Sequence, residues 1–258
     1  MEYYHQTVWP ELDVVFCSVT EQWTGIAVAG PNSRKLLEKV IDIDVSNEAF
    51  PFMAVGECKM NNIPARLFRI SFSGELAYEL NVPADFGEQA WTELLEAGKE
   101  MGVTTYGTEA LGTMRIEKGH VTGTELDGRT TIDDVGRGKM ASPMKSFIGS
   151  SLRQRPELIK EGREQLVGIF PKDRSKTFNA GAILCDENVI SGHGEGRITA
   201  VTHSPALGHW IGLGFIAGGH EAWAGKTVIS ADPVRDGNIE VEIVSPHMYD
   251  PSGEKMHG

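Results

Sequence analysis

Two carboxylates, Glu75 and Glu79, lie within the stretch SFSGELAYEL at residues 71 to 80. If this stretch is a strand, both side chains point to one face and Tyr78 points to the other. A carboxylate at the end of a strand can accept two N–H groups from a flat heterocycle. The alternative is a solvated strand face, and the spacing alone favours that alternative.

A second group with suitable chemistry is Arg115, in the segment EALGTMRIEKGH. It follows Met114 at the edge of the apolar face of an expected helix, where a guanidinium can bind a ligand carboxylate through two hydrogen bonds. The competing interpretation is an exposed arginine paired with Glu109 or Glu117, which would contribute little to stability. Taken alone, the segment favours this second interpretation.

Glycine-rich and histidine-containing segments give weaker indications. The basic segment GRGKM at residues 136 to 140 lacks the GxxxxGK[ST] spacing of a phosphate-binding loop. No GxGxxG pattern supports a dinucleotide site, and SGHGEG at residues 191 to 196 is typical of a turn. The histidines show neither HxH nor HxxxH spacing, so we expect no metal site at His193, His203 and His209.

The elements that must position these residues differ along the chain. Residues 14 to 29 predict two short strands, and GPNSRKLLEKVI after them predicts a helix. The pair Asn61–Asn62 predicts a hairpin turn in CKMNNIPARLFRIS. The segment PADFGEQAWTELLEAGKEMG predicts a helix that stops at Gly102, and YGTEALGTMRIEKGH predicts one that closes at Gly119.

The second half of the chain has a different pattern. The charged segment LRQRPELIKEGREQ is interpreted as a linker. From about residue 160, short apolar runs separated by glycines predict a small β-barrel or meander. These runs are QLVGIF, AILCDENVISGH, GRITAVTHS, WIGLGFI, KTVISA and IEVEIVS.

The composition is that of an ordinary globular chain, and its 258 residues are enough to bury a core without disulfides or metal. The net charge of −12 argues against broad binding to nucleic acid, which needs a basic surface. Cys17, Cys58 and Cys185 are odd in number and lack CxxC spacing. We therefore expect no disulfide framework and a reducing, cytoplasmic setting. No apolar run is long enough to span a membrane.

Five stretches together resemble the folate-binding module of the glycine-cleavage T-protein (aminomethyltransferase) family, in the order found in that family. They are IAVAGPNSRKLL, ISFSGELAYELNVP, YGTEALGTMRIEKGH, DDVGRGKMASPMKSFIG and HSPALGHWIGLGFI. The segment LGTMRIEKGHVTGTELDGRTTIDDVG and the ending IVSPHMYDPSGEKMHG are most similar to one branch of the family. That branch is the C-terminal region of the alpha subunit of heterotetrameric sarcosine oxidase.

The resemblance implies an α+β fold, with a T-protein-like folate-binding α/β domain over residues 1–158 and a small C-terminal β-barrel over residues 159–258. It implies a function as the tetrahydrofolate-binding module of a sarcosine-oxidase-like enzyme. Such a module takes up the one-carbon unit from oxidised sarcosine as 5,10-methylenetetrahydrofolate. Flavin and NAD are expected on other parts of the complex. The other oxidase subunits, among them the flavin-bearing beta subunit, are the expected partners.

The same resemblance assigns site residues, motif by motif. Where the family has TGEDGFEL, this chain has SGELAYEL, so Glu79 is expected to accept the pterin N–H groups. Tyr78 matches the neighbouring aromatic residue, and Arg115 in MRIEKG matches the arginine of the family's LRLEAG helix. The family's aromatic residue in GLSW falls near Lys139, where a lysine would instead meet a glutamyl carboxylate of folate.

One part of the family pattern has no counterpart in these residues. The family's opening segment carries a catalytic Asp in an IDD-like motif, and the fold expected here lacks that segment. No catalytic residue is therefore assigned, and weak folate binding with little independent turnover is expected. Two alternatives stay open: a stand-alone aminomethyltransferase or demethylase, and a non-catalytic docking module with a vestigial folate pocket. The ending SPHMYDPSGEKMHG is interpreted as an interface strap or as a packed terminus.

Overall fold

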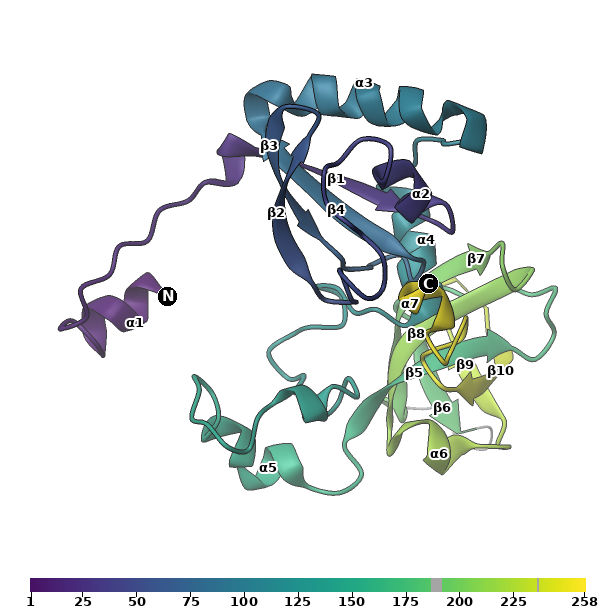
Figure 1. The fold of residues 1–258 in the computed structure, drawn as a ribbon. Helices are drawn as coiled ribbons and strands as arrows, with labels where there is room; N and C mark the ends of the chain where they lie inside the picture. Colours follow the sequence, from purple (N-terminus) through teal and green to yellow (C-terminus); the bar gives the residue numbers. More distant parts are fainter. Residues whose placement is uncertain (187–191, 236) are drawn as a thin grey trace. The chain divides into compact units, whose positions relative to one another are not determined.

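The structure, a computed structural model, describes residues 1–186, 192–235 and 237–258. These residues form two compact units (Figure 1). The units are Met1–Ser71, Leu76–Thr104 and His257–Gly258 for the first, and Phe72–Glu75 and Thr105–Met256 for the second. The domain boundary between residues 158 and 159, which the family resemblance implies, stays a prediction.

The first unit is built on a four-stranded antiparallel sheet with the order β1-β4-β3-β2. Its strands are β1 (Trp23–Ala29), β2 (Val55–Met60), β3 (Ile63–Phe68) and β4 (Ala77–Pro83). Its helices are α1 (Glu2–Thr7), α2 (Ser33–Leu37) and α3 (Gly87–Gly98), with short 3₁₀ turns at Thr20–Gln22, Ala84–Phe86 and Lys99–Met101. In Figure 1, α3 lies along one face of this sheet.

Local sequence signals predicted most of this unit. The hairpin between β2 and β3 turns at Asn61, whose φ of 53° is the left-handed conformation that asparagine tolerates. Helix α3 continues in a 3₁₀ turn and stops at Gly102, which has a φ of 73°. The prediction of two strands over residues 14 to 29 was wrong, because β1 starts at Trp23. Val14 and Val15 are exposed and pair with no described strand, so their β propensity is not realised.

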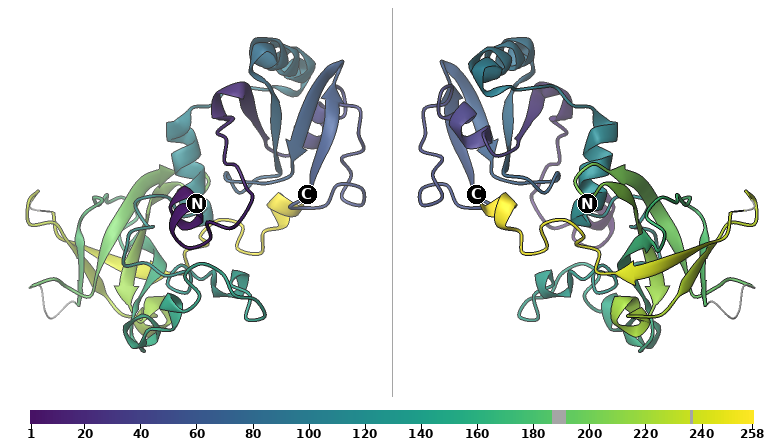
Figure 2. Two further views of the ribbon diagram at one scale, coloured as in Figure 1. Left: turned by 90° about the vertical axis from the view of Figure 1, so that its left-hand side faces the viewer. Right: turned by 90° about the vertical axis from the view of Figure 1, so that its right-hand side faces the viewer.

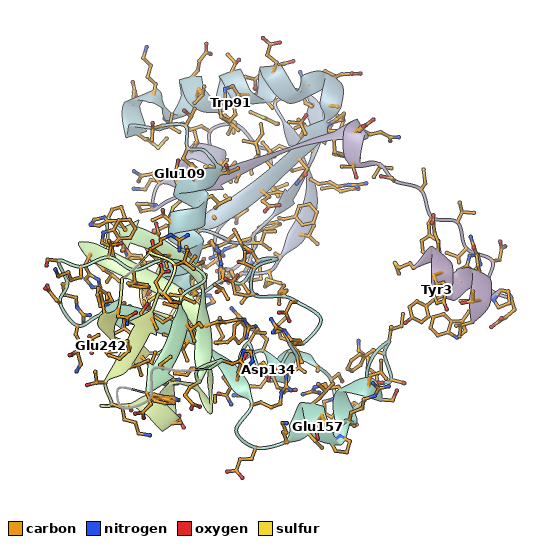
Figure 3. All side chains as sticks on the ribbon, turned by 180° about the vertical axis from the view of Figure 1, so that it is seen from behind. Tyr3, Trp91, Glu109, Asp134, Glu157 and Glu242 are labelled. Carbon is orange, nitrogen blue, oxygen red and sulfur yellow. The ribbon has the colours of Figure 1, made fainter. Side chains whose placement is uncertain are left out.

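The core of the first unit lies between the sheet and its helices. The apolar stripe of α3 that faces inward consists of Ala90 and Leu94 with Gly87 and Gly98. Trp91 lies outside this stripe and is 44% exposed (Figure 3). Only small residues fit at the contact with β1, since a Cβ on Gly87 would lie 2.6 Å from Oγ1 of Thr24.

The second unit contains a closed six-stranded barrel with the order β10-β5-β8-β7-β6-β9. Its strands are β5 (Glu164–Pro171), β6 (Ile183–Asp186), β7 (Gly196–Ser204), β8 (His209–Ala217), β9 (Val228–Ala231) and β10 (Ile239–Val244). All six predicted runs contain one of these strands, and Figure 2 shows the barrel strands from two sides. The prediction of a C-terminal β-barrel is confirmed, although residues 187–191 of the second run lie outside the described residues.

Helices and turns complete the second unit. The helices are α4 (Thr108–Lys118), α5 (Pro156–Ile159), α6 (Gly219–Trp223) and α7 (Glu254–His257), and the 3₁₀ turns are Gly138–Met140 and Leu152–Gln154. Helix α4 closes at Gly119 as predicted and packs on β7 and β8. The predicted linker contains the second 3₁₀ turn and α5, whose residues are not buried. Within the described part of the chain, no helix has the length and apolar character needed to cross a membrane.

Candidate functional site

Tyr78 and Glu79 are neighbours in β4 and point to opposite faces of the first unit's sheet. Tyr78 is fully buried, and its hydroxyl accepts a hydrogen bond from Nε of Arg34 at 3.2 Å. The same hydroxyl donates to the carbonyl of Val45 at 3.4 Å. Tyr78 thus belongs to the core on the helix-covered face, and its contact with a ligand stays a prediction.

Glu79 lies half-buried on the other face of the sheet. Its direct neighbours across the strands are Ala27 of β1 and Phe68 of β3. Among the described residues, no hydrogen bond or ion pair engages the Glu79 carboxylate. A half-buried carboxylate without a partner is able to accept two N–H groups from a ligand without first breaking an existing bond.

Small residues and aromatic rings lie next to Glu79 on the same face of the sheet. Ala27 and Gly25, on the strand beside it, are both exposed and add almost no side-chain bulk. Trp23 and Phe68 lie on the same face and are half-buried. The guanidinium of Arg66 stacks 4.5 Å from the centre of the Trp23 ring. A carboxylate without a partner among the described residues, the small neighbour Ala27 and the aromatic borders together suit a planar, polar ligand.

Glu75 does not share a strand face with Glu79. The strand begins only at Ala77, so Glu75 lies in the preceding bend, after Gly74 with its φ of 85°. A Cβ at Gly74 would lie 2.9 Å from the side chain of Lys118, so this close approach requires a glycine. Glu75 is 24% exposed and pairs with Lys255 at 3.9 Å in the second unit. Glu75 is therefore paired, whereas Glu79 has no partner among the described residues.

Arg115 is buried near the end of α4, where its Nη1 lies 2.8 Å from Oε2 of Glu125. The same nitrogen donates to the carbonyl of His120 at 3.1 Å. The interpretation of an exposed arginine paired with Glu109 or Glu117 was wrong, because the partner is Glu125. Binding of a ligand by Arg115 stays a prediction.

Glu125 has a dense set of partners for a fully buried carboxylate. It accepts hydrogen bonds from the hydroxyl of Thr199 at 2.7 Å and from the backbone N–H of Thr122 at 2.8 Å. Hydroxyls of Thr122 and Thr124 also donate to it. Burial raises the pKa of Glu125, but these hydrogen bonds and the charge of Arg115 hold that pKa below its ordinary value.

Glu117 and Lys118, which follow Arg115 in the MRIEKG motif, also bind side chains of the second unit. Oγ of Ser204, in β7, donates to Glu117 at 2.5 Å. Nζ of Lys118 pairs with Asp250 at 2.9 Å, and both side chains are almost fully buried. These partners were not predicted from the sequence. The available signal was three charged residues, Arg115, Glu117 and Lys118, in the last turn of one helix.

Lys139 lies in the 3₁₀ turn Gly138–Met140 and is exposed. No ion pair of Lys139 occurs within the part of the chain that the structure describes. Its proposed contact with a folate carboxylate stays a prediction. Lys139 and Arg115 belong to the second unit, while Tyr78 and Glu79 belong to the first.

Histidines and cysteines form no metal site among the described residues. His203 instead packs edge-on against Trp210, with ring centres 5.8 Å apart. Cys58 and Cys185 are buried, whereas Cys17 is exposed.

Comparisons with known proteins place this geometry in a family. Residues 1–145 match the model of the GCVT N-terminal domain, and residues 164–250 match that of the glycine cleavage T-protein C-terminal barrel domain. The chain is 40% identical over 262 residues to sarcosine oxidase subunit alpha of Rhizobium meliloti (strain 1021), covering all of this chain and 26% of that protein. It therefore spans about a quarter of the length of that relative.

Two further proteins complete the comparison. An aminomethyltransferase of Halothermothrix orenii is 31% identical over 200 residues, which cover 76% of this chain and 54% of that protein. The crystal structure of aminomethyltransferase T from Bartonella henselae superposes with a TM-score of 0.73 at 21% identity, covering 89% of this chain and 60% of that one. This structural likeness concerns the fold.

Proposed function

The chain belongs to the glycine cleavage T-protein family, and we propose that it is the folate-dependent one-carbon-transfer module of a sarcosine-oxidase-like enzyme. Its similarity over its whole length to sarcosine oxidase subunit alpha supports this assignment. The observation that carries the proposal is the half-buried carboxylate of Glu79, on the face of β4 opposite Tyr78 and without a partner among the described residues.

Glu79 is proposed to hold the pterin ring of tetrahydrofolate. The pterin presents adjacent N–H groups in one plane, and an ionised carboxylate accepts two such groups at once. Ala27 adds little bulk beside the carboxylate, and the half-buried rings of Trp23 and Phe68 offer apolar contact to a flat ligand. The residues present therefore fit the ligand that the family implies.

Tetrahydrofolate supplies two nitrogens that together take up a one-carbon unit, and we propose 5,10-methylenetetrahydrofolate as the product. This chain's part is to bind and orient the pterin through Glu79. Oxidation of the amine is assigned to other parts of the complex, which would hold flavin and NAD. The flavin-bearing beta subunit is the proposed partner, and a cytoplasmic location belongs to the same proposal.

A stand-alone aminomethyltransferase is the second candidate, favoured by the similarity to the Halothermothrix orenii protein. The two candidates differ in whether the chain works with a flavin subunit. Co-expression with a flavin-bearing subunit, followed by size-exclusion chromatography, separates them. A stable complex supports the oxidase module, and a chain that elutes alone and transfers an aminomethyl group supports the second candidate.

Calorimetric titration with folinic acid, a stable reduced folate, tests the proposal. We expect saturable binding that weakens by about 1.5–3 kcal/mol in Glu79→Gln, the contribution of a charge-assisted hydrogen bond. Glu75→Gln is the matched control, because Glu75 lies four residues away and already pairs with Lys255. Equal affinity of Glu79→Gln and the unmodified chain would exclude Glu79 as the pterin acceptor.

A further inference from the structure

Arg69 is the most deeply buried cation of the first unit's described residues, with 1% of its surface exposed. Its Nη1 donates to the carbonyl of Phe50 at 2.8 Å, and its Nη2 donates to the carbonyl of His257 at 2.7 Å. The third nitrogen, Nε, is buried and has no partner among the described residues. Buried charges in proteins are normally paired, and an uncompensated one is costly.

A second cation, Arg34, lies close to Arg69. Burial lowers the pKa of the Arg69 guanidinium, and the charge of Arg34 lowers it further. Arg34 donates to the hydroxyl of Tyr78 at 3.2 Å and to the amide oxygen of Asn47 at 2.5 Å. Both partners are neutral. Among the described residues, neither arginine forms an ion pair, although the chain carries a net charge of −12.

The dipeptide His257–Gly258 covers this pair of arginines. Asn47 donates through Nδ2 to the carbonyl oxygen of Gly258 at 2.8 Å, beside the contact of Arg69 with the His257 carbonyl. The His257 ring packs edge-on against Phe52, with ring centres 4.8 Å apart. A Cβ built on Gly258 would lie 3.1 Å from Nη2 of Arg34. The dipeptide thus places the carbonyl oxygen of His257 against Arg69, where an oxygen of a ligand would lie.

We propose that Arg34 and Arg69 form an oxyanion-binding site on the first unit, and that the dipeptide His257–Gly258 closes this site. Two neighbouring guanidiniums without carboxylate partners suit a phosphate or carboxylate group, which each can bind through two parallel hydrogen bonds. In the closed state, the peptide carbonyl of His257 accepts one hydrogen bond from Arg69. In the open state, an oxyanion replaces this carbonyl and neutralises the charge.

This site is separate from the proposed pterin site. Arg34 binds the hydroxyl of Tyr78, which points to the helix-covered face of β4, whereas Glu79 points to the other face. The oxyanion site therefore extends beyond the proposed function. The experiment that tests this site measures the binding of anions and needs no folate.

Calorimetric titrations with inorganic phosphate and, separately, with acetate test the proposal on three chains. These are the full chain, a chain that ends at Met256, and that shortened chain with Arg34→Gln. We expect saturable binding in the shortened chain, at least tenfold weaker binding in the full chain, and loss of binding with Arg34→Gln. Stronger binding of phosphate or of acetate identifies the chemical source of the oxyanion.

Two results would overturn the proposal: a folded shortened chain without saturable binding of either anion, or one with the affinity of the full chain. Circular dichroism and urea unfolding check its folding. If the shortened chain does not fold, Phe52→Ala in the full chain replaces it, because this change removes the ring contact of His257. Phosphate affinity should then rise, and an unchanged affinity contradicts the proposal. Arg66→Gln, an exposed arginine of β3, is the control.

Discussion

Arg115 and Glu125 form a buried ion pair, with Nη1 of the arginine 2.8 Å from Oε2 of the glutamate. The glutamate also binds Thr199 of β7, so this pair joins the end of α4 to the barrel. The arginine that sequence reasoning offered as a ligand contact therefore has a structural partner. Glu117 and Lys118 have the same kind of anchor in the same helical turn.

We predict that Glu125→Ala destabilises the second unit by about 3–5 kcal/mol, because it leaves the buried charge of Arg115 without a partner. Urea unfolding measures the effect. The double variant Arg115→Met with Glu125→Leu should lose less than Glu125→Ala, since it removes both charges together. Glu157→Gln, in an exposed pair with Lys160, is the control. Equal stability of Glu125→Ala and this control would show that the buried pair contributes nothing.

The free energy of unfolding should depend on pH through the protonation of buried carboxylates in the second unit, among them Glu125. The pKa of Glu125 lies below its ordinary value of 4.5 in the folded chain. A carboxylate with a lowered folded pKa binds fewer protons folded than unfolded, so its stabilising contribution is complete above pH 4.5 and is lost as the pH falls through the folded pKa. Urea midpoints between pH 7 and pH 3 should decline, and Glu125→Gln should flatten the decline. An unchanged slope in Glu125→Gln would assign the decline to other groups.

Thiol reactivity should separate the three cysteines. Burial, together with the charge of Asp42, raises the pKa of Cys58 to about 11. Cys185 is buried as well, whereas Cys17 is exposed. Since thiolates are the reactive form, a chromogenic disulfide reagent should modify one thiol rapidly in the folded chain. Cys17→Ser should remove this fast phase, and a fast phase that survives the change would contradict the assignment.

Substitution by alanine should change the stability in opposite directions at two glycines, Gly119 and Gly112. Gly119 has a φ of 78°, and a Cβ there would lie 2.4 Å from the carbonyl oxygen of Pro246. Gly119→Ala should therefore destabilise the chain by more than about 1 kcal/mol, from strain and displacement of the backbone. Gly112 lies inside α4 with open space around it, so Gly112→Ala should stabilise by about 0.5–1 kcal/mol. Thermal unfolding of both variants checks the difference in sign.

The sequence by itself determined the elements whose signals are local. Asn61 marked the hairpin turn, and Gly102 and Gly119 marked the helix ends, because positive φ angles restrict the residue type at these positions. Short apolar runs separated by glycines predicted the six barrel strands. The family motifs predicted Glu79 as a ligand-binding residue. In the structure its carboxylate has no partner among the described residues.

Only the tertiary structure decided which charged groups are paired. Glu75 and Glu79 look equivalent in the sequence, yet Glu75 pairs with Lys255, 180 positions away along the chain, and Glu79 has no partner in the part of the chain that the structure describes. Arg69 meets the carbonyl of His257 across a sequence separation of 188 residues. The free energy of a charged side chain depends on burial and on its partners in space. Neither quantity is encoded in the neighbouring residues, so the sequence could name candidate groups but could not assign their partners.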